Sequence, residues 1–199
     1  MENTIKNKET IALIGCGILA KEIHFLIKKN RWDVKKQLFD SSLHVNFSKL
    51  KKKLGDSIEK NRTLRKVLFL GACHPLLNKI EREHKLFRTK GQNCVEILLG
   101  KKRFQQELAQ GAFFLLEDWA RRFSYITGMA FNESDSITRE IFQMGHSHLL
   151  GIRTPCSDDF NQEAIAASRL VDLPLKWIDV DLDILESNLE MTLERTRGQ

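Results

Sequence analysis

Two short apolar runs, each ending at a glycine, constrain the fold of this 199-residue chain more than any other feature. Residues 11–14 end at Gly15, and residues 67–70 end at Gly71. A run that is apolar at every position and bounded by turn residues is typical of a strand buried on both faces. The sequence therefore predicts two buried parallel strands, each leading through a turn into a helix.

Strand-like and helix-like segments alternate along the rest of the chain. We expect further strands at 37–40, 86–88, 112–116, 149–152 and 175–180. We expect helices at 18–30, 76–85, 94–99, 101–110, 136–144 and 160–171, a lysine-rich helix before Asn61 and a final amphipathic helix from Leu182. This alternation predicts an α/β fold, with a mostly parallel sheet flanked by helices on both faces, as in Rossmann-like proteins. We predict a flexible N-terminus over 1–9 and one α/β domain over 10–196.

The composition favours an intracellular protein. The first ten residues are polar and lack the apolar run of a secretory signal, and no segment reaches the roughly 18 apolar residues of a membrane span. We therefore expect a cytoplasmic chain that does not contact a membrane. In that compartment its four cysteines are expected as thiols, metal ligands or catalytic groups rather than as disulfides. The chain has no Cys-x-x-Cys pair, hydrolase elbow or phosphate loop, which excludes several enzyme classes.

A net charge of +6 raises the question of nucleic-acid binding. The densest basic group is Lys49 with residues 51–53, but Leu50 and Leu54 lie four residues apart within it. That spacing is typical of a helix with one buried stripe and a solvated lysine face. We therefore do not expect nucleic acid as a partner.

Three cysteines fall where strands give way to helices. Cys16 and Cys73 follow the two apolar runs, and Asn93 with Glu96 forms a capping-box pattern that makes Cys94 the first residue of a helix. Ligands bind beyond the carboxyl ends of parallel strands, so we expect the three thiols to converge there. A thiolate at a helix N-terminus is stabilised by the free N–H groups. Three thiolates could hold zinc with one open position, or three irons of a [4Fe-4S] cluster. The alternative is that they only fill the core.

The same residues resemble the DUF1638 family of bacterial and archaeal proteins, clearly over 11–119 and more loosely in the C-terminal third. The resemblance implies that the cysteines belong to shared motifs, and that metal-linked or corrinoid-linked chemistry takes place with a partner enzyme in a methyl-transfer pathway. Two positions depart from the family pattern, His74 in place of glycine and Asn93 in place of aspartate. The matching residues are Cys16-Gly17, Glu22, Leu43-His44, Gly71, Cys73, Cys94, Leu98-Leu99-Gly100, residues 111–115 and Trp119.

The leading hypothesis is a metal- or iron–sulfur-dependent enzyme, a transferase or lyase, that acts on a small molecule. Cys16, Cys73 and Cys94 would be the metal ligands. His74, His44 and Glu22 are the candidates for proton transfer. One alternative is a non-catalytic accessory protein that carries a metal or a corrinoid to another enzyme.

A second alternative is an oxidoreductase that binds NAD(P). Gly15-x-Gly17-x-x-Ala20 follows a predicted strand, and Asp40 comes about twenty residues later, which approximates a dinucleotide fingerprint. Gly15, Gly17 and Gly71 are accordingly the candidate positions for close approach of a cofactor to the backbone. Tyr125 lacks a lysine four residues on, so the reductase Tyr–Lys pair is missing. A tight strand-to-helix turn explains the glycines equally well.

Three further residues, two histidines and a cysteine, could take part in a site or serve only the structure. His146 and His148 flank Ser147 before a predicted strand, and an extended backbone would place both on one side, where they could bind a metal. Hydrogen bonding within a loop is the simpler reading. Cys156 follows Pro155 in a polar loop and is interpreted as incidental.

Overall fold

The computed structural model describes residues 10–72, 75, 77–131 and 135–198, and of His44 it describes the backbone alone. The N-terminus at 1–9, Cys73 and His74 lie outside these ranges. All described strands run parallel, in two sheets with the strand orders β2-β1-β3-β4 and β5-β6-β7. The α/β, Rossmann-like fold is confirmed. The strands are β1 (Ile11–Cys16), β2 (Val34–Phe39), β3 (Arg65–Phe69), β4 (Phe87–Arg88), β5 (Ala112–Leu116), β6 (His148–Arg153) and β7 (Leu175–Asp179).

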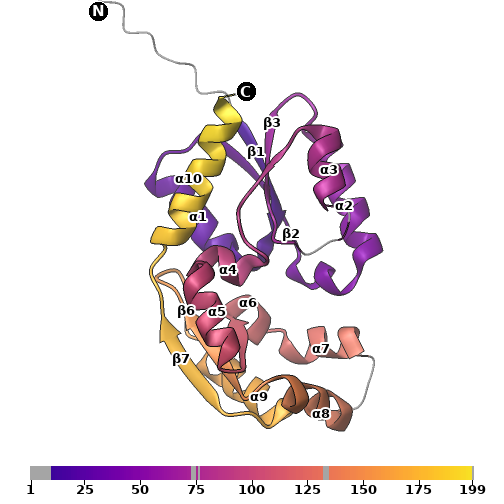
Figure 1. Cartoon of the computed structure of the whole chain (residues 1–199), viewed down its shortest axis with the longest axis vertical. Helices are drawn as coiled ribbons and strands as arrows, with labels where there is room; N and C mark the ends of the chain where they lie inside the picture. The colour runs from indigo at the N-terminus through magenta and orange to yellow at the C-terminus, as the bar shows by residue number, and fades with distance from the viewer. Residues whose placement is uncertain (1–9, 73–74, 76, 132–134, 199) are drawn as a thin grey trace, which may run out of the picture.

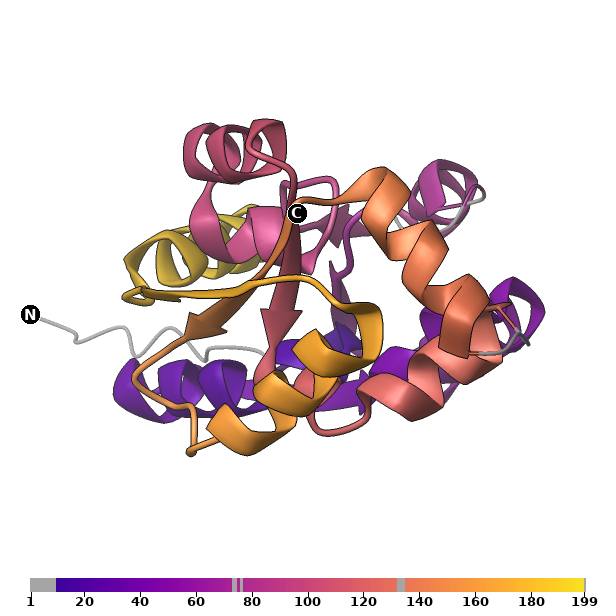
Figure 2. The same cartoon turned by 90° about the horizontal axis from the view of Figure 1, so that it is seen from below.

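Helices surround both sheets (Figures 1 and 2). In Figure 1, α1 and α10 lie on one side of the first sheet, and α2 and α3 lie on the other. The helical segments are η1 (Gly17–Leu19), α1 (Ala20–Lys29), η2 (Ser41–Val45), α2 (Phe47–Lys60), α3 (Leu77–His84), α4 (Cys94–Leu99), α5 (Lys101–Ala109), α6 (Glu117–Ala120), α7 (Phe123–Phe131), α8 (Asp135–Gly145), α9 (Asn161–Val171) and α10 (Asp183–Arg197).

The first strand runs further than its apolar residues suggest. Gly15 lies inside β1, paired with Leu38 of β2 and Phe69 of β3. A side chain at Gly15 would overlap the backbone carbonyl of Phe69, and one at Gly17 would overlap that of Phe39. Both glycines are therefore required by close packing between strands, whatever else they do.

The capping prediction at the start of α4 is confirmed. The Oδ1 atom of Asn93 accepts a hydrogen bond of 2.9 Å from the N–H of Glu96. The N–H of Gln92 donates to Glu96 Oε2 at 3.2 Å, which fixes the approach to Cys94. Gly100 has a φ of +76°, a conformation that favours glycine, so α4 ends there and α5 starts in a new direction.

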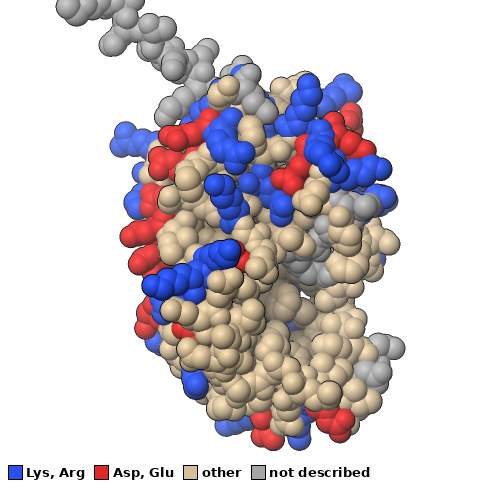
Figure 3. Space-filling view, in the orientation of Figure 1, with Lys and Arg blue, Asp and Glu red and all other residues tan. Residues whose placement is uncertain are grey.

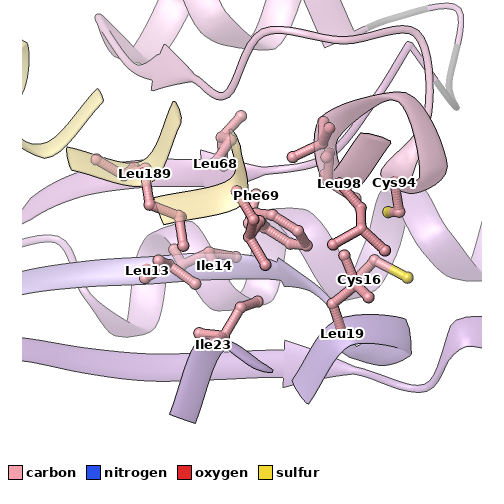
Figure 4. Close-up of a cluster of buried hydrophobic side chains, with 14 of the residues drawn as sticks. Leu13, Ile14, Cys16, Leu19, Ile23, Leu68, Phe69, Cys94, Leu98 and Leu189 are labelled. Atoms are coloured by element: carbon pink, nitrogen blue, oxygen red, sulfur yellow. The ribbon is translucent and has the colours of Figure 1, made fainter. Parts of the chain in front are cut away.

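The C-terminal helix returns to the first sheet. Leu185, Leu189 and Leu193 of α10 are fully buried in the core that contains Leu13 and Phe69 (Figure 4). The same core takes in residues from the ends of β5 and β6, namely Leu116 and Ile152. The division into one domain over 10–196 stays a prediction. Within the described ranges, no helix is long and apolar enough to cross a membrane.

Candidate functional site

An apolar cavity of about 250 Å³ lies alongside β5 over its whole length and reaches Ile18, just after the carboxyl end of β1. Its walls come from η1, α4, α5, β5, α6 and the residue that follows α8. On the face shown in Figure 3 the surface is hollowed between the two halves of the molecule, and the atoms around the hollow are mostly uncharged. Only the part of the cavity near Ile18 and Cys94 follows the rule that ligands of parallel α/β proteins bind beyond the carboxyl ends of strands, since the rest flanks β5. The residues important below are Cys94, Phe104, Phe113, Phe114, Trp119 and His146.

A second cavity, of about 400 Å³, lies next to the first. The two share Ile18 and Leu116 as a wall, but the second is lined by charged side chains. Lys21 binds both Glu117, at 2.7 Å, and Asp158, at 2.6 Å. Two cationic side chains of this cavity therefore stand against four acidic ones, whereas none of the described residues that line the first cavity is Lys, Arg, Asp or Glu.

Cys16 and Cys94 both lie at the rim of the first sheet, while the convergence of all three thiols stays a prediction. Cys16 is the last residue of β1 and Cys94 the first of α4, and both are buried in the same core. In Figure 4 both cysteines lie on the same side of that core. Cys94 also lines the apolar cavity. Since α4 has only six residues, its dipole contributes little to the thiolate.

The segment that leads to Cys73 is attached directly to the start of α4. The N–H of Ala72 donates to the carbonyl oxygen of Gln92 at 2.6 Å. Gly71 packs so tightly on Asn93 that a side chain would overlap its backbone. Cys73 itself lies outside the described ranges, so its role as a ligand stays a prediction. Within those ranges, no three His, Cys, Asp or Glu side chains form a complete metal site.

Glu22 is the proton-transfer candidate that the structure describes in full. Its side chain is buried and lines the second cavity. Thr154 Oγ1 donates a hydrogen bond of 2.7 Å to Glu22 Oε1. Burial raises the pKa of Glu22, because the charged form loses hydration. A carboxyl group with a raised pKa suits general acid and base chemistry. His74 and the side chain of His44 are not described.

Cys156, interpreted as incidental, lies beside Glu22. Its N–H donates to Thr154 Oγ1 at 3.1 Å, and its side chain packs on the first core. Burial raises the pKa of the Cys156 thiol, and the charge of Glu22 adds to the effect. Cys156 comes just after a predicted strand. The rule that selected the other cysteines would therefore have selected Cys156 too.

The two histidines around Ser147 have separate surroundings. His148 is buried in β6 and its Nδ1 lies 2.9 Å from Ser147 Oγ. His146 lines the apolar cavity, with its ring 5.2 Å from that of Phe113. Burial lowers the pKa of His146, which keeps the imidazole neutral. The sequence did not suggest this aromatic neighbour.

The dinucleotide reading gains no support from Asp40. Arg122 binds both oxygens of Asp40, at 2.9 and 2.8 Å. Hydrogen bonding to Ser42 and the Arg122 guanidinium lower the pKa of Asp40 to about 2. A carboxylate held in this way is engaged with the protein rather than available to a ribose. NAD(P) binding stays a prediction, as do the cofactor roles of Gly15, Gly17 and Gly71.

Fold and site together define a parallel α/β protein with thiols at the rim of its first sheet and an apolar cavity alongside β5. The chain belongs to the DUF1638 family, described as "Protein of unknown function", which matches residues 38–189. The matched segment contains Cys94 and His146, begins after Cys16 and includes most of the C-terminal third, where the resemblance is looser. No curated protein and no solved structure gives a match.

Proposed function

We propose that this protein is a metal- or iron–sulfur-dependent enzyme that acts on a small molecule. Cys16, Cys73 and Cys94 are its metal ligands, and the neighbouring apolar cavity receives the substrate. One observation carries the proposal: Cys16 and Cys94, far apart in the sequence, are buried on the same side of one core (Figure 4), and Cys94 reaches the cavity wall.

The donor set fits zinc or an iron–sulfur cluster. Thiolates are soft ligands, and both metals prefer them to carboxylates. The hydrogen bond from Ala72 to Gln92 supports including Cys73, because it fixes the residue before Cys73 next to the start of α4. Zinc held by three thiolates supplies a Lewis acid with one open position, and a four-iron cluster supplies one exposed iron.

The chain's own residues supply the rest of the chemistry. Cys94 marks where a substrate in the cavity meets the ligands, and the apolar walls favour an apolar part of the substrate there. Glu22, whose pKa is raised by burial, is the candidate for giving or taking a proton in the adjoining cavity. A cytoplasmic location, which keeps thiols reduced, accords with this role.

Metal analysis of the protein purified without oxygen tests the proposal. We expect about one zinc per chain, or iron with acid-labile sulfide. Cys16→Ser, Cys73→Ser and Cys94→Ser should each lower the metal content at least about tenfold, since losing one thiolate breaks the site. Cys156→Ser is the matched control and should retain the metal. Equal metal content in all four variants, or none in the unaltered protein, would contradict the ligand assignment.

A non-catalytic accessory protein for a metal or a corrinoid is the alternative within the same site. Turnover of a substrate distinguishes the accessory protein from the enzyme. An accessory protein gives up its metal or corrinoid to a partner enzyme in a methyl-transfer pathway, whereas an enzyme keeps the metal while it consumes substrate.

A further inference from the structure

Glu22 differs from the other acidic side chains that line the second cavity. Each of the other three binds a cationic side chain, in the pairs Lys21–Glu117, Lys21–Asp158 and Arg122–Asp118. The Oε1 atom of Glu22 accepts the hydrogen bond from Thr154, and the other donor to its carboxyl group is its own N–H. Among the described residues, Glu22 is thus the acidic side chain of this cavity that has no cation within ion-pair distance.

One oxygen of Glu22 is available to a ligand. The residue is only 6 % exposed, so its carboxyl group is almost removed from bulk water. Oε2 has no hydrogen-bond partner among the other described residues, and it is not sealed from water. Glu22 lines the second cavity, so a ligand in that cavity can reach Oε2. Burial of a carboxylate without a counter-charge is costly, and a bound cation would offset that cost.

An organic ammonium ion fits this place better than a metal ion. All residues that line the second cavity are described, and within the described ranges no three His, Cys, Asp or Glu side chains gather to hold a metal. An alkylammonium group brings three hydrogen-bond donors of its own and needs only acceptors. Beside Glu22, the apolar side chains of Ile18 and Leu116 offer contact to alkyl carbons. A cavity of about 400 Å³ has room for a short chain.

We infer that the second cavity binds a small alkylammonium ion, with its ammonium group on the carboxylate of Glu22 and its alkyl chain against Ile18 and Leu116. The inference goes beyond the proposed function, because it assigns a second binding site that is separate from the thiol ligands. The site requires no metal, so it can be tested on its own.

Butylammonium, butanol and butyrate share a carbon chain length and differ in charge. Titration at pH 8 is followed in ¹H–¹⁵N spectra of the full chain. We expect butylammonium to shift the N–H signals of Gly17, Glu22 and Ser157, which line the cavity. It should bind about tenfold more tightly than butanol, since hydrogen bonds to charged groups are stronger than neutral ones. Butyrate should bind more weakly than butanol, because its charge would face the carboxylate of Glu22.

The variant Glu22→Gln keeps the size of the side chain and an oxygen for Thr154, but removes the charge. The preference for butylammonium over butanol should fall to about one in this variant. Asp56→Asn is the matched control, because it removes one negative charge from an exposed position of α2 outside the cavity. The control should retain the preference. The spectrum of each variant without probe also shows that the variant is folded.

Four results would overturn the inference. They are tightest binding by butyrate, an unchanged preference in Glu22→Gln, an equal loss of preference in Asp56→Asn, and no shift of the three N–H signals at a large excess of butylammonium. Metal content is measured on the cysteine variants, whereas amine binding is measured on Glu22→Gln. Failure of the amine site and failure of the metal site are therefore separate results.

Discussion

Thr154 Oγ1, just beyond the end of β6, donates a hydrogen bond of 2.7 Å to the buried carboxyl group of Glu22 in α1. The bond joins the two sheets through residues whose sequence positions give no hint of contact. It also places a titratable group with a raised pKa at the junction of the two halves.

Glu22→Gln should flatten the dependence of stability on pH. Burial raises the folded pKa of Glu22 above its ordinary value of 4.5, so the folded state binds this proton more tightly than the unfolded state. Its stabilising contribution is present in full below pH 4.5 and is lost as the pH rises through the folded pKa, by up to about 1.4 kcal/mol per pH unit. Urea unfolding of the unaltered protein and of Glu22→Gln from pH 4 to 8 measures how the free energy of unfolding depends on pH. A constant difference across that range would contradict it.

Asp40→Asn should have the opposite pH dependence. The folded pKa of Asp40 is lowered to about 2 from 3.8, so its contribution is present above pH 3.8 and is lost as the pH falls toward 2. The group is half exposed, so solvent screening limits the expected loss at pH 7 to about 1 kcal/mol. Urea unfolding at pH 7 and pH 3 should show the loss shrinking at the lower pH. The exposed Asp56, changed to Asn, is the control and should change stability at pH 7 by less than about 0.5 kcal/mol.

Gly15→Ala should destabilise the protein by about 2 to 3 kcal/mol or prevent folding, because the added carbon would overlap the Phe69 carbonyl. Gly55 offers a matched control, since the space around it in α2 is open. Gly55→Ala should stabilise the protein by about 0.5 to 1 kcal/mol through helix propensity. Thermal unfolding compares the two. Equal effects would show that β1 and β3 do not approach closely at this position.

Leu189→Ala should cost about 2 to 5 kcal/mol, because the side chain is fully buried in the first core. Met191, on the same helix, is 47 % exposed, so Met191→Ala should change stability by less than about 0.5 kcal/mol. Chemical denaturation measures both values. A small loss for Leu189→Ala would mean that α10 does not complete the core of the first sheet.

Strands β1 and β3 could be predicted because their apolar runs are continuous, and α4 because its cap is local. Strand β2 starts three residues before the expected 37–40, because Lys35 and Lys36 hide its beginning. The grouping of strands into two sheets could not, since alternation along the chain does not determine which strands pair. Helix α7 was missed because it has no clear polar face: Phe123 and Ile126 are buried, yet its exposed side includes Tyr125.

Site residues could be predicted only where they come just after a predicted strand in the sequence. Position after a strand pointed to Cys16 and should have pointed to Cys156. The cavity combines side chains from distant elements, such as Phe104 of α5 and His146 after α8, which no local pattern connects. The hydrogen bond between Thr154 and Glu22 also joins distant segments, so no local sequence pattern indicates it.

Cobalt(II) titration of metal-stripped protein tests the central claim most directly, because thiolate coordination gives a charge-transfer absorption that other ligands do not. The account predicts that this absorption saturates at about one equivalent in the unaltered protein and in Cys156→Ser, and falls strongly in Cys16→Ser and Cys94→Ser. Absorption of equal strength in Cys16→Ser and Cys94→Ser, or no such absorption in the unaltered protein, would contradict a shared thiolate site.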